Sequence, residues 1–470
     1  MVAPMEQNRV PSSTRLRFFI VVGAAAFFLF ALLTHRFAVN NEYYFLWVWR
    51  RLPWRIYWIN LPLSVPFFFA QYIFRRGARS HFFALALLWL SCFLLMLGCA
   101  ACELDPPSLG RVAQIVLNPF DTGFFLDARD LKLNGISIHD LLQHYPNILP
   151  QLTGHARNKP PGVILFHSAV ISLMGAGTNG ALTSGIVIGM LAALGPAAVY
   201  VFIRYFTGDR DAAFTGASFM ALCPGPLIFF PVFDQIYPLL TAGITILWAR
   251  AIDRDRLGDS IALGILAALV TLTTYLLALL GFFLIGYAAL RIWIKPRARP
   301  RRILLHAAVA IAAFVGFYLV LCAVSGFDPV ATFRRAIYVE RVTSTQWYAV
   351  TAHRPRLLPG TIPWDFYSFA IGSGWISYLL AAFYFMSTAS DPGRRRRLPI
   401  ALLCIAQLLL VAVTNLVPGE NWRVWIFMMP MLILPVALEL KTWSFAQRCT
   451  VYIALLLLTL AICQNLIVRS

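Results

Sequence analysis

A polar stretch near residue 120 carries carboxylates at a spacing suited to acid–base chemistry. In FDTGFFLDARDL, Asp121, Asp127 and Asp130 follow a long apolar run. A carboxylate held near an acceptor can act as a general base that removes the proton of a hydroxyl group. The alternative is a solvated loop whose acids cap short helices, a role that suits Asp130 and Asp140. The spacing alone leaves both interpretations open.

A basic segment follows about thirty residues later. In GHARNKPPG, His155, Arg157 and Lys159 alternate, so in an extended chain their side chains project to the same side. Such cations just outside a membrane can bind an anionic group such as a phosphate, and ordinary contact with lipid headgroups is the alternative. His139 and His144 do not combine with His155 in a compact ligand spacing, so we expect no metal site.

Two further polar positions interrupt apolar sequence. Asp234 is a lone carboxylate in LIFFPVFDQIYPLL, and Glu420 and Arg423 stand three apart in PGENWRVW. Ionisable groups at membrane depth are costly and usually face a protein interior or an aqueous cavity. Exposure of Asp234 in a loop and a structural ion pair of Glu420 with Arg423 are the simpler alternatives. We retain Asp234, Glu420 and Arg423 as candidates for substrate binding.

The elements that must position these residues are membrane helices. The chain has 470 residues, of which 60% are hydrophobic and 13% charged, with a mean hydropathy of +0.72. Apolar runs of roughly 20 residues recur, enough to cross the hydrocarbon as a helix, and they are too uniformly apolar for barrel strands. We therefore predict an all-α polytopic membrane protein with about thirteen transmembrane helices.

Charge placement gives the orientation. The net charge is +19, but the basic clusters are short and lie beside apolar runs, for example at 295–302 and 394–397. This pattern marks cytoplasmic loops and argues against a nucleic-acid partner. Cys99 and Cys102 have CxxC spacing at the end of a membrane helix with no second pair, which favours small apolar filler over redox or zinc chemistry.

The same pattern predicts the organisation of the chain. Residues 1–16 are expected to form a disordered cytoplasmic tail and residues 17–75 an N-terminal transmembrane pair. Residues 76–470 are expected to form a membrane catalytic domain whose polar loops, 102–162 and 325–365, lie outside the cytoplasm. The N-terminus is then cytoplasmic and the large first loop extracytoplasmic.

These pieces, in their order and topological side, resemble the GT-C superfamily of polyprenyl-phosphate-sugar-dependent glycosyltransferases. The branch that contains protein O-mannosyltransferases and lipid A aminoarabinose transferases is the most similar. DTGFFLDARDL is similar to its first-loop motif, with Asp121 at the acid position and Phe124–Phe125 as the aromatic pair, and HARNKPPG is similar to its HxPPG-like segment. Thr122 stands where the motif has a second acid, which keeps Asp127 as a substitute for Asp121.

The resemblance implies an inverting glycosyltransferase. The sequence leaves a bacterial inner membrane and the endoplasmic reticulum open as its location, and we favour the bacterial inner membrane. Asp121 would accept the proton of a glycan, lipid or protein acceptor. Arg157, Lys159 and Arg423 would neutralise the charge that accumulates on the polyprenyl phosphate as it leaves. The resemblance requires no nucleotide sugar and no redox cofactor, and the loop offers no ligand set for a divalent metal.

Two other classes of protein remain open on sequence alone. One is a transporter or flippase for a lipid-linked sugar, with Asp234 and Glu420 as intramembrane groups. The other is a non-catalytic scaffold that keeps the GT-C fold, which the absent second acid makes plausible.

Overall fold

The computed structural model describes residues 12–36, 47–77, 81–119, 122–294, 300–351, 360–388, 391–414 and 421–468. These residues are predominantly helical, and one short two-stranded sheet is present among them. The predicted all-α fold class is confirmed.

The N-terminal part contains α1 (Ser12–Leu33), β1 (Trp47–Trp49), α2 (Arg55–Leu63), α3 (Val65–Arg76) and α4 (His81–Ala101). The polar loop and its exit contain α5 (Gly110–Val116), α6 (Phe124–Leu133), α7 (Ile138–Gln143), α8 (Tyr145–Ile148), η2 (Leu149–Gln151) and α9 (Gly162–Met174). The central part contains α10 (Thr178–Ala192), α11 (Gly195–Thr207), α12 (Arg210–Ala221), α13 (Pro224–Ile228), η3 (Phe233–Ile236), α14 (Tyr237–Arg254), α15 (Leu257–Thr273), η4 (Leu276–Leu280), α16 (Gly281–Ile294), α17 (Pro300–Ser325) and α18 (Pro329–Thr351). The C-terminal part contains α19 (Thr361–Ser373), α20 (Ile376–Thr388), α21 (Pro392–Arg395), α22 (Leu398–Thr414), α23 (Asn421–Val424), η5 (Trp425–Met428), α24 (Met429–Leu440), α25 (Phe445–Asn465) and β2 (Leu466–Val468).

Several of the expected membrane crossings are short or broken helices. In the described ranges, seven helices are long and apolar enough to span a membrane, or up to eight if the pair α19 and α20, bent by 105°, is one span. The sequence count of about thirteen included segments such as α12, whose 12 residues extend only ~18 Å. Pro224 follows α12, and Gly374 separates α19 from α20, so proline and glycine account for interruptions that hydropathy alone does not reveal.

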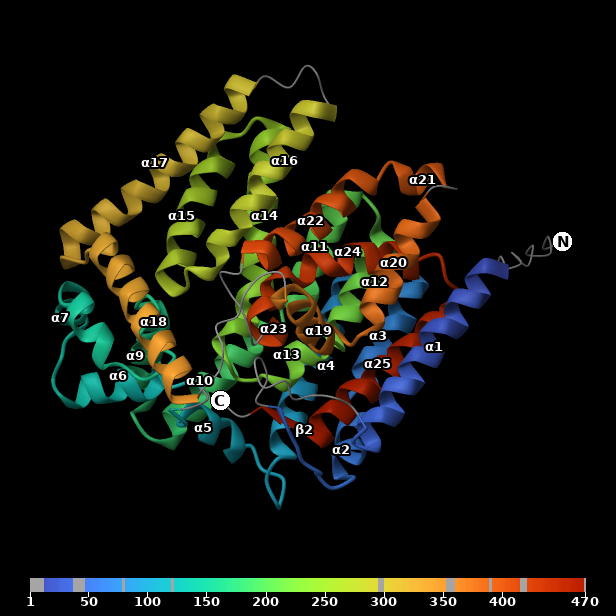
Figure 1. The fold of residues 1–470 in the computed structure, drawn as a ribbon, viewed down its shortest axis with the longest axis horizontal. Helices are drawn as coiled ribbons and strands as arrows, with labels where there is room; N and C mark the ends of the chain where they lie inside the picture. Colours follow the sequence, from blue (N-terminus) through green and yellow to red (C-terminus); the bar gives the residue numbers. More distant parts are fainter. Residues whose placement is uncertain are drawn as a thin grey trace.

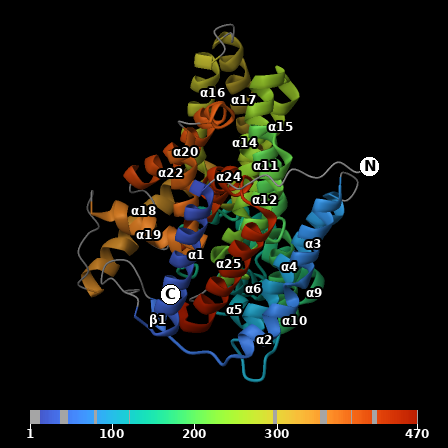
Figure 2. The ribbon, with the colours of Figure 1, turned by 90° about the vertical axis from the view of Figure 1, so that its right-hand side faces the viewer.

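The core surrounds α24. Every residue of α24 is buried, and the helix is apolar around most of its circumference, as expected for a helix enclosed by protein. It contacts α20, α12 and α22, while α1 packs along α25 at the edge of the bundle. In two views at right angles, α15, α16 and α17 extend beyond this bundle as an arm (Figures 1 and 2).

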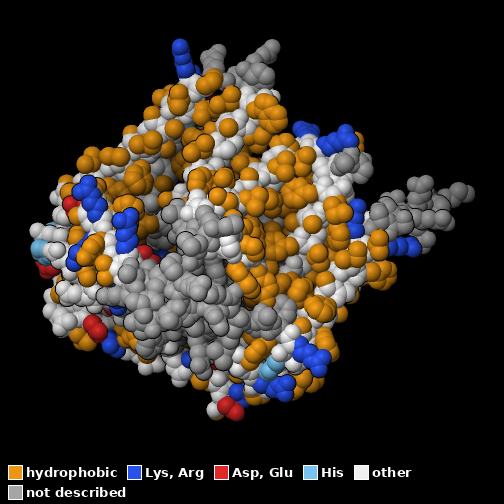
Figure 3. Space-filling view, viewed as in Figure 1, with side chains coloured by type: hydrophobic (Ala, Val, Ile, Leu, Met, Phe, Trp, Pro, Cys, Tyr) orange, Lys and Arg blue, Asp and Glu red, His pale blue; other side chains and the backbone are white. Residues whose placement is uncertain are grey.

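The surface of the arm is suited to lipid contact. Orange hydrophobic side chains cover it, and many Lys and Arg side chains on this face lie at its margins (Figure 3). Only 6% of the apolar window of α17 is buried inside the protein. A soluble protein rarely exposes so large an apolar surface. The exposed apolar side chains of the arm therefore indicate an integral membrane protein.

The N-terminal elements are joined to the C-terminal ones. Residues 12–16, assigned to a tail from the sequence, form the first turn of α1, whereas residues 1–11 lie outside the described residues. β1 pairs antiparallel with β2, with Val48 opposite Ile467. The pairing continues beyond the strands, because the backbone N–H of Leu52 donates to the Gln464 carbonyl at 2.9 Å.

Glu439 is a fully buried carboxylate in the otherwise apolar α24. It accepts hydrogen bonds from Arg17 of α1 and from the Trp443 indole, each at 3.1 Å, and from Arg394 of α21. A buried charge is tolerated only with such partners. One carboxylate therefore fixes the relative positions of α1, α21 and α24.

Replacing Glu439 with Gln should destabilise the protein by about 3 kcal/mol, because it leaves the partly buried Arg17 without its counter-charge and Arg394 with only the more distant Asp391. Thermal unfolding of the purified protein in detergent measures the effect. Asp130→Asn is the matched control, since its exposed pair with Arg129 contributes less than about 1 kcal/mol. Equal unfolding temperatures for the two variants would contradict the assignment.

Candidate functional site

The polar loop is fixed where it leaves α4. Glu103 accepts hydrogen bonds from Arg50 and from Arg111 of α5, each at 2.7 Å. Burial opposes ionisation of this carboxylate, but the two guanidinium groups outweigh it and hold the pKa of Glu103 below its usual range. The start of the loop is thereby tied to α5 and to the segment that follows β1.

Asp127 holds the middle of the loop. It is buried in α6, and its two oxygens accept hydrogen bonds from the Thr153 backbone N–H at 3.0 Å and the Thr153 hydroxyl at 2.7 Å. Burial raises the pKa of Asp127, although the hydrogen bonds from Thr153 act in the opposite direction. Because both oxygens are engaged, Asp127 in this geometry positions the basic segment, and its catalytic role remains a prediction.

Gly123 allows this arrangement. Its φ of +70° lies in the left-handed region, and a Cβ placed on it would come within 1.9 Å of the Thr153 hydroxyl. Any other residue would be strained in the backbone and would displace Thr153. The glycine of the DTG sequence is therefore required for the contact between α6 and the basic segment.

Lys159 is positioned through its backbone. The hydroxyl of the buried Tyr145 donates to the Lys159 carbonyl at 2.9 Å. Beyond the two prolines, Gly162 begins α9 so close to the end of α15 that a Cβ would meet the Leu272 carbonyl at 2.5 Å. The PPG sequence thus brings Lys159 against the end of a membrane helix.

Interruptions of the membrane helices meet at the same place. The chain is broken between α12 and α14, between α15 and α16, and before α24. Carbonyl groups freed at these breaks are satisfied by side chains. Gln235 donates to the Pro226 carbonyl at 2.8 Å, and Gln407 donates to the Leu279 carbonyl at 2.9 Å. Irregular backbone at membrane depth occurs where protein or a polar cavity surrounds it, so this convergence identifies a candidate site.

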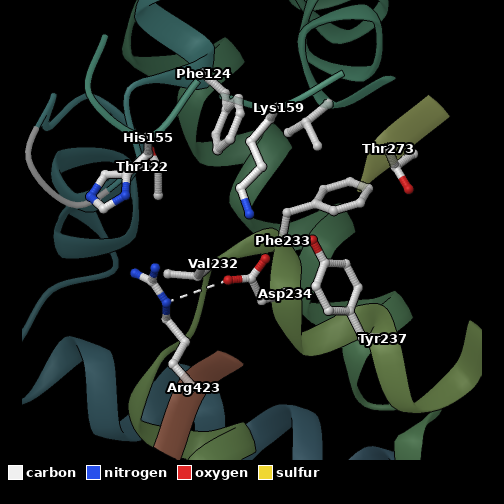
Figure 4. A pocket seen from close by; sticks show the side chains of 11 residues that line it. Thr122, Phe124, His155, Lys159, Val232, Phe233, Asp234, Tyr237, Thr273 and Arg423 are labelled. Carbon is white, nitrogen blue, oxygen red and sulfur yellow. Dashed lines mark ion pairs between the residues drawn. The ribbon is translucent and has the colours of Figure 1, made fainter. Parts of the chain in front are cut away.

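A pocket lies between the loop and these breaks (Figure 4). It is lined by Thr122, Phe124, His155, Lys159, Val163, Val232, Phe233, Asp234, Tyr237, Thr273 and Arg423. Its volume of about 20 Å³ is slightly above the roughly 10–15 Å³ that one water molecule needs. Figure 4 shows Lys159 reaching from the loop toward Asp234, with Arg423 and the Tyr237 hydroxyl on opposite sides of the carboxylate.

Charge in the pocket is unevenly paired. Arg423 Nε lies 3.4 Å from Asp234 Oδ2, and each side chain is 16% exposed. This distance exceeds the roughly 2.7–2.9 Å of a close charge-assisted hydrogen bond. Lys159 Nζ makes no hydrogen bond or ion pair with any residue that the structure describes. An ammonium group beside a guanidinium group in a small pocket is suited to binding an anion.

The structure brings together four of the residues singled out in the sequence. His155, Lys159, Asp234 and Arg423 line the pocket, although 264 positions separate Lys159 from Arg423. Arg157 does not line it. Asp121 and Glu420 lie outside the described residues. In the described ranges no group of three or more His, Cys, Asp or Glu side chains is arranged to hold a metal ion.

Sequence reasoning did not identify Tyr237 and Thr273 as parts of this site. Tyr237 follows Asp234 by three residues, and Thr273 is the last residue of α15. Polar residues directly beside a break were the available signal. It was not specific, because many such residues only satisfy freed backbone groups.

No protein-family model and no curated protein sequence matches this chain. The fold is similar to the crystal structure of ArnT from Cupriavidus metallidurans bound to undecaprenyl phosphate, with a TM-score of 0.50 and 14% sequence identity. The match covers 78% of this chain and 61% of that protein, so the chain spans less than two thirds of it. The apo structure of the same ArnT matches with a TM-score of 0.46, 14% identity, and coverage of 70% of this chain and 56% of that protein. The first match shows that this chain shares the overall fold of that ArnT structure.

Replacing Thr153 with Val should loosen the basic segment, because the Asp127 carboxylate loses its shortest hydrogen bond while remaining buried. We expect a destabilisation on the order of 1–3 kcal/mol and faster amide hydrogen exchange around Lys159. Hydrogen exchange measured by mass spectrometry tests this. Thr450→Val, at an exposed position in α25, should leave the exchange of that segment unchanged. Unaltered exchange in the Thr153 variant would show that Asp127 does not position the loop.

Proposed function

We propose that the protein is a membrane glycosyltransferase that takes a sugar from a polyprenyl-phosphate donor and transfers it, with inversion, to an acceptor on the non-cytoplasmic face of a bacterial inner membrane. The observation that carries the proposal is the Lys159 ammonium group in a pocket shared with Arg423 and Asp234 at the ends of broken membrane helices. The similarity to the fold of an undecaprenyl-phosphate-bound ArnT supports the class of donor.

The cations suit the leaving group. A polyprenyl-phosphate sugar is a phosphodiester with one negative charge, and departure of the sugar leaves a monoester whose second ionisation lies near pH 6. Negative charge therefore increases on the phosphate in the transition state. A positive charge within about 4 Å at an effective dielectric constant near 20 contributes up to ~4 kcal/mol of attraction. Lys159 and Arg423 lower the barrier because this attraction grows as the bond breaks.

Asp234 has a complementary role beside Arg423. Its carboxylate lies 3.4 Å from Arg423 Nε, and both side chains line the pocket. A donor phosphate in the pocket would offer oxygen acceptors that match the planar donors of the guanidinium group. The Tyr237 hydroxyl, which points toward Asp234, can hydrogen-bond the carboxylate when the phosphate is bound (Figure 4).

Donor binding requires the pocket to widen. A sugar phosphate is far larger than the cavity of about 20 Å³, which holds roughly one water molecule. Lys159 is the lining side chain best able to move, because it has a flexible four-carbon stem and no partner among the described residues. Withdrawal of the Lys159 side chain would let the donor enter, and its return would place the ammonium group beside the phosphate.

Asp121 remains the proposed general base for the acceptor, from the resemblance of its motif alone. The proposed orientation rests on the basic clusters. They indicate that the loops at the opposite ends of the helices are cytoplasmic, so the pocket faces away from the cytoplasm.

Replacing Lys159 with Gln should lower kcat on the order of 100-fold, because one charge that stabilises the leaving phosphate is lost. The assay follows transfer of labelled sugar from a polyprenyl-phosphate donor by purified protein in detergent or lipid. Lys159→Arg should retain more activity than Lys159→Gln, and Lys132→Gln, an exposed lysine of the same loop, should remain at the wild-type rate. Wild-type kcat in Lys159→Gln would remove this residue from the mechanism.

Replacing Asp121 with Asn should abolish transfer while leaving the unfolding temperature unchanged, because an amide cannot accept the acceptor's proton. The same transfer assay gives the rate, and Asp130→Asn serves as the control within the same motif. Full activity in Asp121→Asn would exclude this carboxylate as the base and would return attention to Asp127.

The assay also separates the rival classes. Movement of labelled lipid across vesicles without covalent transfer would identify a flippase. Binding of the donor with neither transfer nor movement would identify a non-catalytic protein with the GT-C fold.

A further inference from the structure

A second cavity lies at the other end of α4 from the candidate site. Its volume is about 280 Å³, well above the roughly 10–15 Å³ needed for one water molecule. It is lined by Gln71, Phe74, Arg75, Asp211, Phe214, Phe445 and Arg448. These residues come from α3 and from the first turns of α12 and α25. Phe74 contacts His81, the first residue of α4, whereas the polar loop follows the last residue. The 21 residues of α4 separate the two ends by ~30 Å.

One wall of the cavity is rigid and apolar. The rings of Phe74 and Phe214 are stacked with centroids 3.8 Å apart and an interplanar angle of 3°. Beside them, the buried Gln71 amide donates to the Ser218 hydroxyl at 2.8 Å. This wall joins α3 to α12 and lowers the local dielectric constant. A charged group bound beside it therefore interacts more strongly with the opposite wall.

The other side carries guanidinium groups that the fold leaves incompletely satisfied. Arg448 donates from Nη1 to the Thr215 hydroxyl at 3.2 Å, but its Nε is buried and has no hydrogen-bond partner in the described part of the chain. Arg75 lies over the Phe445 ring at 5.1 Å. Arg210, next to the cavity over the Phe74 ring at 5.8 Å, also has a buried Nε without a described partner.

The charge of the cavity is positive. Two arginines and one carboxylate, Asp211, are the charged groups among its described lining residues. Asp211 is exposed and lies in the first turn of α12, where the helix dipole favours an acid. It does not pair directly with the arginines, so their positive charge is not neutralised. Guanidinium groups present planar arrays of donors that match phosphate oxygens.

We propose that this cavity binds a phosphate-bearing anion, the chemistry offered by the headgroup of an anionic phospholipid. The arginines engage the phosphate oxygens, and the aromatic wall contacts the carbon atoms attached to them. The basic clusters assign this end of the helices to the cytoplasmic face, where anionic lipids attract basic residues near the membrane. The site is separate from the pocket of the proposed glycosyltransferase and does not depend on that function.

Binding is tested with the full-length protein in detergent, by the shift of its unfolding temperature on titration with short-chain phosphatidylglycerol. Short-chain phosphatidylcholine and inorganic phosphate are titrated in parallel. The double variant Arg75→Gln, Arg448→Gln should bind phosphatidylglycerol at least tenfold more weakly, because charged hydrogen bonds are lost. Arg301→Gln, an exposed arginine of α17 away from the cavity, should bind like the wild type.

A variant expected to change binding in the opposite direction controls for a folding defect in the double variant. Asp211→Asn removes the carboxylate from an exposed position and should tighten binding several-fold, since it raises the net positive charge of the cavity. The unfolding temperature of each variant without ligand reports whether it is folded.

The outcomes are distinct. Loss of the shift in the double variant with a gain in Asp211→Asn supports the site. A shift with phosphatidylglycerol alone identifies a lipid headgroup, and an equal shift with inorganic phosphate at the same concentration identifies a free anion as ligand. Equal binding by the wild type, the double variant and Asp211→Asn, or equal loss in Arg301→Gln, would overturn the proposal, because the arginines would then contact lipid only as ordinary basic residues.

Discussion

A backbone that leaves the helical conformation inside a membrane must have its polar groups satisfied by protein, and this constraint shapes the centre of the molecule. The interruptions after α12, after α15 and before α24 lie together and are closed by side-chain amides such as those of Gln235 and Gln407. Because the breaks lie together, they form a polar surface at a depth where uninterrupted helices would present only apolar side chains. Asp234, Thr273 and Arg423 all lie at these breaks, so the same requirement that stabilises the fold also creates the pocket.

The two sides of the pocket differ in how firmly they are held. The loop side is fixed by close contacts, because Asp127 engages Thr153 through both oxygens and Tyr145 holds the backbone of Lys159. The helix-break side carries the ion pair between Asp234 and Arg423, at 3.4 Å. The backbone of Lys159 is therefore held in place, while its flexible four-carbon side chain extends into the pocket toward that pair (Figure 4).

The sequence predicted the class of fold and the location of the polar loop, because long apolar runs and their basic flanks are local signals. His155 and Lys159 were recognisable as cations of the polar loop, and Asp234 and Arg423 as charged residues in apolar surroundings. Their meeting in one pocket depends on tertiary packing that no local pattern encodes. The engagement of Asp127 with Thr153 was equally hidden, since it joins residues 26 positions apart through a left-handed turn at Gly123. Several of the expected crossings are short or broken helices in the described ranges, because hydropathy does not register the breaks at Pro224 and Gly374.

The small sheet formed by β1 and β2 has a consequence for the order of events during synthesis. β1 lies near residue 48 and its partner near residue 467, so the edge of β1 has no native partner until the intervening segment has been made. The N-terminal helices can enter the membrane early, but this attachment waits until Leu466–Val468 has left the ribosome. Pairing of the two strands is therefore a late event in synthesis, and a chain interrupted before Leu466 would lack this attachment of its first segments.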